Sequence, residues 1–392
     1  MRNVAIIIQN LNGGGAERTA SNLSLYLSAK YNMHLIVFDS RNITYPYKGK
    51  LHDLETAPVA GKLGKAVNVL KRVRAVKKIL RKEKIDCAIS LMDGANLVNV
   101  LSKQKNKVIT SVRNQMSKTN QGEVIVPPRL KKMTEFISKK SDYMVSLSKG
   151  VEEDLRVNFG VAQEKLVTIY NPCEYEQLLK NTEKTTLELP AGNALITMGR
   201  LNPQKGQWHL IRALTLVKQQ IPDVKLYILG QGELQEKLQK LIDALELSEN
   251  VKLLGYVEAP HSCFQYADCF VFPSMFEGLG NALLEAMAFG LPCISTDCYS
   301  GPREILAPGT KMQEHLEEVA YCEYGVLTSV CSGGSFNAED PLSKEEKQLA
   351  EAIVTMLTDN ALRQKYAQKS RERVLDFAPE KIAADWMKVI EE

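Results

Sequence analysis

The chain has 392 residues, of which 44% are hydrophobic and 24% charged, and its formal net charge is +4. This length exceeds what one hydrophobic core usually supports, so two domains are expected, and the composition is that of a globular protein with ample material for cores. No apolar run approaches the roughly 18 residues of a membrane span. The apolar run at the N-terminus is too short for a signal peptide.

Cysteine spacing and the distribution of charge indicate the cell compartment and the kind of partner. The eight cysteines form no C-x-x-C pair and no ligand spacing with histidine. We therefore expect reduced thiols, no zinc, no disulfide and a cytoplasmic protein. Residues 1–185 carry 31 Lys and Arg against 17 Asp and Glu, a net charge of +14, whereas the remainder carries 19 against 29, a net charge of −10. The basic half implies a partner of negative charge.

Short apolar runs alternate with longer amphipathic runs, which predicts α/β structure with doubly wound parallel sheets. Strands are predicted within residues 3–9, 33–39, 86–92, 107–113, 143–148 and 165–172, and then within 194–200, 224–230, 251–257, 269–274, 292–297 and 325–330. We expect a Rossmann-like domain over 1–175, a linker over 176–190 and a second such domain over 191–375. A C-terminal helix, 376–392, is expected to pack back on the first domain. Ligands of open α/β sheets bind beyond the carboxyl ends of the strands, so the loops there are the candidate sites.

The first such loop reads QNLNGGGAER. Its glycines, among them Gly14 and Gly15, predict a tight turn, and the helix that opens at about Ala16 presents free amides that can hold a phosphate or a sugar hydroxyl. A Rossmann dinucleotide site is the competing interpretation, but the G-x-G-x-x-G spacing is absent. A plain glycine turn remains open.

Residues 61–84 hold ten Lys and Arg and one acidic residue. The apolar residues of this segment fall near helical spacing, which predicts an amphipathic helix with a very basic outer face; they are Leu63, Val67, Leu70, Val73, Val76 and Leu80. Residues 127–140 add a second basic set. We expect binding to an anionic bilayer, at ~1 kcal/mol per Lys or Arg near the surface, with a merely solvated face as the alternative. Nucleic acid is not expected, because no aromatic stacking platform is present.

The loop that opens the second domain reads GRLNPQKG and contains Arg200 and Lys205. Two cations after a first strand suit a diphosphate, although surface cations are common. The later strand ends carry Gly230, Gly232, Gly255 and Val257, which are weaker candidates for the walls of a base pocket.

The run FEGLGNALLE places Glu277 and Glu285 eight positions apart around a predicted helix start. Gly278 and Gly280 allow a close backbone approach to a ligand, and the helix from about Asn281 favours a diphosphate. Glu285 can accept two hydrogen bonds from a ribose diol, and Glu277 can reach a sugar beyond the diphosphate. An ordinary acidic helix start explains Glu285 but neither Glu277 nor the glycines.

This run resembles the E-x(7)-E signature of the family-four retaining glycosyltransferases, which have the GT-B fold. Six further runs resemble the family in the same order along the whole chain: NGGGAER, YNP, GRLNPQKG, GQGEL, LLGYV and GLPCISTDCYSGPREIL. The first and last are similar to the branch that builds lipopolysaccharide cores, capsules and lipid-linked glycans. The resemblance implies two Rossmann-like domains that face each other across a cleft.

The resemblance also implies roles for individual residues. Arg200 and Lys205 would hold the donor diphosphate and stabilise the leaving group, and Glu285 would bind the ribose. Glu277 would contact the donor sugar and phosphates together with backbone of the loop and helix start. The remaining implied donor contacts are Gly14, Gly15, Gly230, Val257, Gly278, Leu279, Gly280 and Asn281. No cofactor is implied, and no metal is expected, because cations and helix amides can stabilise the leaving group and no DxD motif is present.

One position departs from the family. Many members carry histidine after the strand KVITSVR, where this chain has Arg113 and Asn114. Arg113 can contact the diphosphate or the donor sugar, but its pKa above ~12 excludes a role as base.

The function implied is a retaining glycosyltransferase that moves a hexose or N-acetylhexosamine from a UDP-sugar to a lipid-linked or polysaccharide acceptor. The sequence does not decide between a front-face route and a covalent intermediate; we favour the front-face route, and Glu277 is the nucleophile candidate of the alternative. The protein would associate peripherally with the inner face of the cell membrane. Two alternatives are a UDP-sugar 2-epimerase of the same architecture and a non-catalytic partner subunit. The epimerase would need acid/base side chains at the sugar C2. Loss of any of the four charged residues Arg200, Lys205, Glu277 and Glu285 would have favoured the partner subunit.

Overall fold

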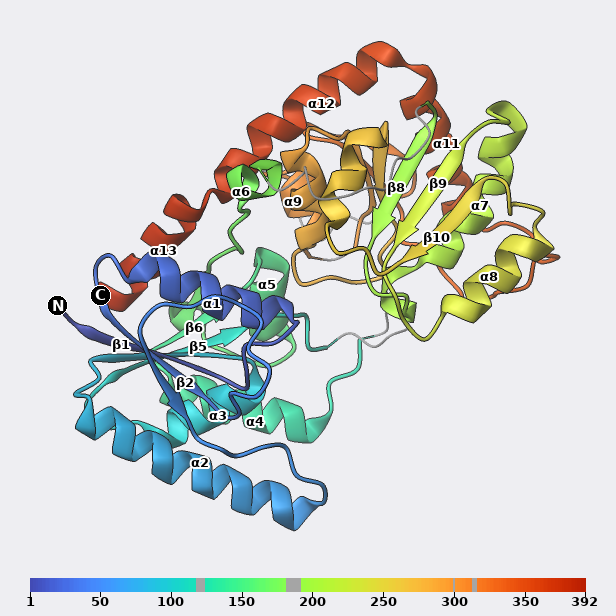
Figure 1. The fold of residues 1–392 in the computed structure, drawn as a ribbon. Coiled ribbons are helices and arrows are strands. Elements are labelled where there is room, and N and C mark those ends of the chain that lie inside the picture. Colours follow the sequence, from blue (N-terminus) through green and yellow to red (C-terminus); the bar gives the residue numbers. More distant parts are fainter. Residues whose placement is uncertain (118–123, 181–191, 299, 312–315) are drawn as a thin grey trace. The chain divides into compact units, whose positions relative to one another are not determined.

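The computed structural model describes residues 1–117, 124–180, 192–298, 300–311 and 316–392. They form two compact units. The first unit comprises Met1–Met116, Val126–Pro172 and Pro379–Glu392, and the second comprises Ser117–Ile125 and Cys173–Ala378. Each unit is an α/β structure built on one seven-stranded sheet (Figure 1).

The strands of the first sheet all run parallel. Their order is β3 (Lys50–Asp53), β2 (Asn32–Val37), β1 (Asn3–Ile8), β4 (Cys87–Leu91), β5 (Lys107–Val112), β6 (Tyr143–Ser146) and β7 (Leu166–Thr168). The run VAIII of β1 is apolar throughout because both of its faces are buried. Val4 and Ile6 join one core, and Ala5 and Ile7 join the core on the other face.

Helices cover both faces of this sheet (Figure 1). On one face, α1 (Gly15–Leu27) and α13 (Pro379–Glu391) share the core of Val4 and Ile6. On the other face, α2 (Lys62–Lys82) and α3 (Asp93–Ser102) share the core of Ala5 and Ile7. The remaining helices are α4 (Pro128–Lys140), α5 (Lys149–Val157) and the short 3-10 turn η1 (Gln163–Lys165). Trp386 of α13 is fully buried, so the last helix of the chain is part of the core of the first unit.

The second sheet has the order β10 (Val251–Gly255), β9 (Lys225–Leu229), β8 (Ala194–Met198), β11 (Cys269–Phe272), β12 (Cys293–Thr296), β14 (Val326–Thr328) and β13 (Ala320–Tyr321). β13 runs antiparallel to β14, and the other pairings are parallel. Its α-helices are α6 (Tyr175–Lys180), α7 (Gln207–Gln220), α8 (Gln235–Ala244), α9 (Asn281–Ala288), α10 (Pro302–Leu306), α11 (Lys344–Thr358) and α12 (Asn360–Val374). The 3-10 segments among its described residues are η3 (Pro203–Lys205), η4 (Pro260–Tyr266) and η5 (Leu375–Phe377). Among the described residues, no helix is both long and apolar enough to cross a membrane.

The structure has a strand in each predicted run and adds two that the sequence did not predict. These are β3, which is short and lies at a sheet edge, and β13, which has two residues. The predicted linker begins as a helix, because α6 spans Tyr175–Lys180 and buries Leu178. The rest of the predicted linker, 181–190, lies outside the described residues.

The predicted buried face of α2 is wrong for half of the helix. Val73, Val76 and Leu80 are buried, but Leu63, Val67 and Leu70 are 85%, 50% and 56% exposed. At 3.6 residues per turn the second set lies roughly 100° around the helix from the first. The outer face therefore mixes exposed apolar side chains with Lys62 and Lys65 in its first half, and it is mainly basic in its second half.

Candidate functional site

The carboxyl ends of β8 and β11 bring Lys205 and Glu277 together. These strands are neighbours at the point where the strand order of the second sheet reverses, which is where open α/β sheets bind ligands. Lys205 Nζ lies 2.5 Å from Glu277 Oε1 and 5.1 Å from the ring centroid of Phe272. Gly206 has a φ of 61°, and a Cβ there would lie 2.2 Å from the carbonyl oxygen of Pro273. A glycine is therefore required for the two loops to approach this closely.

The loop that carries Glu277 leads directly into α9. Gly280 is the N-cap residue, with a φ of 96°, and no side chain caps the helix. The amides of the first turn are thus available to a negatively charged group. The segment after β12 supports this loop. The Ser300 hydroxyl donates a hydrogen bond to the carbonyl of Glu277. Gly301 packs so closely that a Cβ there would lie 2.0 Å from the carbonyl oxygen of Leu279.

Glu285 lies one turn into α9 and is buried. Its Oε2 lies 3.0 Å from Nε2 of His261, which comes from η4. His261 was not predicted as a site residue, because a lone histidine in a loop carries no motif. The structure adds it to the site through this contact with a predicted residue.

The other predicted residues of the second unit lie at the same edge of the sheet. Arg200 follows β8, but its side chain is exposed and forms no ion pair with any residue that the structure describes. Gly230 follows β9, and a Cβ there would lie 2.0 Å from the carbonyl oxygen of Gly199, so the loops after β8 and β9 touch. Val257 follows β10 and is half-buried. The structure thus pairs Lys205 with Glu277, whereas Arg200, on the same loop, forms no ion pair with Glu277.

In the first unit, Gly14 and Gly15 lie at the start of α1. Gly14 is the N-cap residue and no side chain caps the helix. The side chain of Glu17 lies against Gly14, where a Cβ would come within 2.0 Å of its Oε2. A carboxylate in the first helical turn is favoured by the helix dipole. The glycines therefore form a turn against which an anionic group already lies.

Arg113 follows β5 and is only 8% exposed. Its guanidinium donates to Asn171 Oδ1, and it lies 3.4 Å from Thr19 Oγ1 on α1 and 3.3 Å from Ser111 Oγ. All three partners are neutral, and Arg113 forms no ion pair within the described part of the chain. Burial lowers the pKa of Arg113 to about 9. Asn114 is exposed and forms no hydrogen bond or ion pair with its side chain among the described residues.

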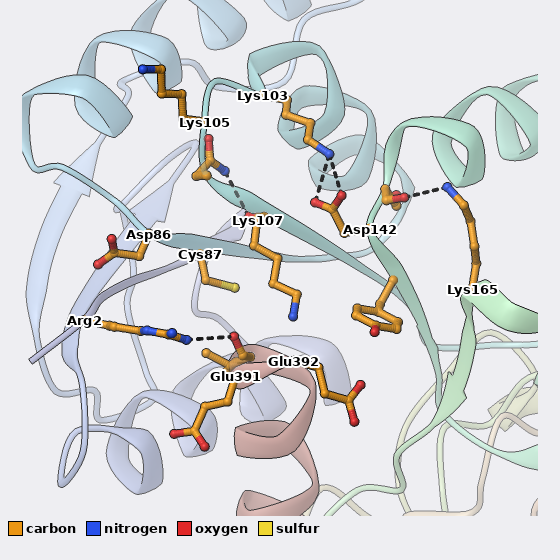
Figure 2. Close-up of a pocket in the computed structure, with 14 residues that line it drawn as sticks. Arg2, Asp86, Cys87, Lys103, Lys105, Lys107, Asp142, Lys165, Glu391 and Glu392 are labelled. Carbon is orange, nitrogen blue, oxygen red and sulfur yellow. Dashed lines mark hydrogen bonds and ion pairs between the residues drawn. The ribbon is translucent and has the colours of Figure 1, made fainter.

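A cavity of about 810 Å³ lies at the amino ends of the strands of the first sheet, away from the carboxyl ends that carry the predicted residues (Figure 2). Arg2, Asp86, Asn106 and Asp142 line it, and each precedes a strand. Two of its lysines donate to carbonyl oxygens at helix ends: Lys107 Nζ to Val389 O at 2.6 Å and Lys165 Nζ to Ser141 O at 2.8 Å. A third, Lys103, donates through Nζ to Asp142 Oδ1 at 2.7 Å. Cations at the C-terminal ends of α13 and α4 complement the helix dipoles. We assign this cavity a structural role.

Within the described residues, no group of three or more His, Cys, Asp or Glu side chains is arranged to hold a metal ion. All eight cysteines have free thiols. Burial raises the pKa of the Cys298 thiol, which lies near Glu277, well above its ordinary value.

Comparison with known proteins places this geometry in a family. The sequence profile described as Glycosyltransferase Family 4 matches residues 13–177, and that described as Glycosyl transferases group 1 matches residues 180–314. An uncharacterized glycosyltransferase of Methanocaldococcus jannaschii is 36% identical over 342 residues, which cover 82% of this chain and 83% of that protein. The chain belongs to glycosyltransferase family 4. The predicted family and the GT-B fold class are confirmed.

Two further similarities bear on this glycosyltransferase. It is 29% identical over 400 residues, the full length of both chains, to a Campylobacter jejuni enzyme named N-acetylgalactosamine-N,N'-diacetylbacillosaminyl-diphospho-undecaprenol 4-alpha-N-acetylgalactosaminyltransferase. The crystal structure of Anabaena HepE in complex with UDP-glucose has a TM-score of 0.71 to the glycosyltransferase at 16% identity, and the similarity covers 100% of both chains. The second similarity shows a shared fold.

Proposed function

We propose that this glycosyltransferase moves a hexose or N-acetylhexosamine from a UDP-sugar to an acceptor without a metal ion. The observation that carries the proposal is the Lys205–Glu277 pair at the uncapped start of α9, with Glu285 one turn further on. Lys205 and the helix amides would bind the diphosphate and stabilise the negative charge that develops on it as the sugar leaves. Glu285 would accept hydrogen bonds from the ribose diol, and Glu277 would contact the sugar. The HepE complex with UDP-glucose supports a uridine donor.

Retention of anomeric configuration is part of this proposal. The Campylobacter jejuni relative is named for an α-linked product. An α-linked product made from an α-linked nucleotide sugar keeps its configuration. A front-face route would suit this chain, because the carboxylate of Glu277 is paired with a cation and is thereby a poorer nucleophile.

The acceptor is proposed to be a glycan carried on a lipid diphosphate. The name of the same relative, which matches over its whole length, specifies a diphospho-undecaprenol-linked saccharide. The basic charge of residues 1–185 fits an acceptor and a surface of negative charge.

The first unit is further proposed to rest on an anionic membrane through α2. Its outer face presents Leu63, Val67 and Leu70 in the first half and Arg74, Lys78 and Arg81 in the second. Apolar side chains inserted at the acyl boundary and basic side chains at the headgroups are the two components of interfacial binding. In Figure 1, α2 lies on the outside of the first unit.

Calorimetric titration with UDP, GDP and ADP, in the presence of a chelator, tests the donor assignment. Selective micromolar binding of UDP that is lost in Glu285→Ala is the expected result. Transfer from UDP-hexoses and UDP-N-acetylhexosamines to a lipid-diphosphate saccharide then identifies the sugar, and NMR of the product gives the anomeric configuration. Absence of binding to every nucleotide would contradict the proposed donor site.

A further inference from the structure

His261, which lies outside the predicted set, contacts the predicted donor-binding side chain of Glu285 in the second unit. It lies in η4, and its Nε2 lies 3.0 Å from Glu285 Oε2. The histidine side chain is 22% exposed and the glutamate side chain 9%. The contact is therefore shielded from solvent on the glutamate side and open on the histidine side.

Aromatic rings fix the orientation of this histidine. The His261 ring stacks on Phe289, with centroids 6.3 Å apart and planes at 5°. The edge of Phe264 meets it at 5.6 Å and 84°. Phe264 and Phe289 are themselves packed at 5.4 Å. An imidazole held on two sides has little rotational freedom, so the direction of its Nε2 is set before any ligand arrives.

We propose that His261 is a positioning residue for Glu285 and that it sets the selectivity of the site for a ribose with its 2′-hydroxyl. This inference rests on the proposed donor site. The Nε2–H donates to one carboxylate oxygen and fixes the plane of the carboxylate. A carboxylate has about four lone-pair sites, and the bond from Nε2 uses only one of them. A carboxylate that is already oriented loses less side-chain entropy when the diol binds.

The experiment compares UDP with 2′-deoxy-UDP by calorimetry in three proteins. In the wild type we expect UDP to bind about tenfold more tightly, because a hydrogen bond to a charged acceptor contributes this much. In His261→Leu, the affinity for UDP should fall to nearly that for 2′-deoxy-UDP. The affinity for 2′-deoxy-UDP should change little. In His261→Gln, whose amide nitrogen can replace Nε2, most of the discrimination should return.

A double-mutant cycle adds a second check. In the Glu285→Ala background, His261→Leu should have no further effect on UDP, since the two side chains act through one contact. Thermal denaturation establishes that each variant is folded.

The outcomes separate the two proposals. If the wild type binds no UDP, the donor assignment fails and this inference fails with it. If the wild type binds UDP and His261→Leu keeps full discrimination, only the role of His261 is overturned. If His261→Leu weakens the binding of both nucleotides equally, the histidine has a structural role. If His261→Leu binds UDP more tightly, the histidine competes with the ribose for Glu285. Either result overturns the inference.

Discussion

Lys205 and Glu277 form an ion pair with Nζ and Oε1 2.5 Å apart, although both side chains are proposed to contact the donor. In the absence of ligand, each neutralises the other at the carboxyl edge of the second sheet. A diphosphate that binds Lys205 brings negative charge next to Glu277. The two side chains should therefore affect nucleotide affinity in opposite directions.

Lys205→Met should weaken UDP binding and lower the rate of transfer by about a hundredfold or more, because the role proposed for this cation is to stabilise the leaving diphosphate. Glu277→Gln should strengthen UDP binding by about five- to tenfold, equivalent to ~1 kcal/mol, while transfer falls because the contact to the sugar is altered. Calorimetry and steady-state kinetics measure both. Lys240→Met, on the exposed face of α8, is the matched control. Unchanged transfer in Lys205→Met would contradict the diphosphate assignment.

Replacement of Arg113 should separate stability from activity. Its buried guanidinium contacts only neutral partners, and burial lowers its pKa to about 9. Folding therefore disfavours the charged form, and this cost is present at neutral pH. Arg113→Gln should keep or raise the melting temperature by roughly 2–4 °C and should lower kcat/KM at least about tenfold if a substrate anion binds there. A large loss of stability with normal transfer would instead assign Arg113 a purely structural role.

The outer face of α2 can be tested with lipid vesicles. Gln substitution of Leu63, Val67 and Leu70 should weaken binding to anionic vesicles at all salt concentrations. Gln substitution of Arg74, Lys78 and Arg81 should weaken it mainly at low salt, by ~1 kcal/mol for each charge. The matched control replaces Lys240 and Lys252, which are exposed in the second unit. Equal binding of wild type and both variants, or of wild type to neutral and anionic vesicles, would contradict membrane docking through α2.

The first unit should lose stability in mild acid through His34 and His52. His34 Nδ1 on β2 lies 3.1 Å from His52 Nε2 on β3. Burial lowers the pKa of both from 6.5, and Lys50 lowers them further while Glu83 opposes this. The folded state therefore favours the neutral rings, and stability falls as the pH drops below about 6.5, where the unfolded chain takes up protons.

Melting temperatures measured from pH 7.5 to 5 check this expectation. The wild type should lose roughly a few °C more than His52→Gln across this range. Parallel curves for the two proteins would show that the histidine pair does not control the acid response.

Parallel-sheet strands were predictable because strands buried on both faces are continuous apolar runs, and the loops after them carried the glycines and charges. β3 was missed because KLHD at a sheet edge has no such run. The pairing of Lys205 with Glu277 was not predicted either, since it depends on which strands are neighbours in the sheet. His261 reaches Glu285 only through the fold of η4, and no spacing rule encodes that contact.

The face of α2 illustrates a limit of periodicity. Apolar residues spaced by three and four positions predict a single apolar face. Successive steps of three, however, shift that face around the helix, because three residues are less than one full turn. Leu63 and Val76 satisfy the same pattern and end on different sides. Which side meets the sheet is decided by where the helix is anchored, and here Val73, Val76 and Leu80 provide that anchor.

The membership of α13 in the first core has a consequence for synthesis in the cell. Ile382, Trp386, Val389 and Ile390 complete a core whose other buried members lie between Val4 and Ile169. At ~5–20 residues per second, the ribosome needs on the order of ten to forty seconds to travel from Pro172 to Pro379. For that interval the nascent first unit exposes an apolar face without its last helix, while the second unit is still being translated. Chaperone capture should therefore concentrate on the first unit, and truncations before Pro379 should stay bound to chaperones rather than fold.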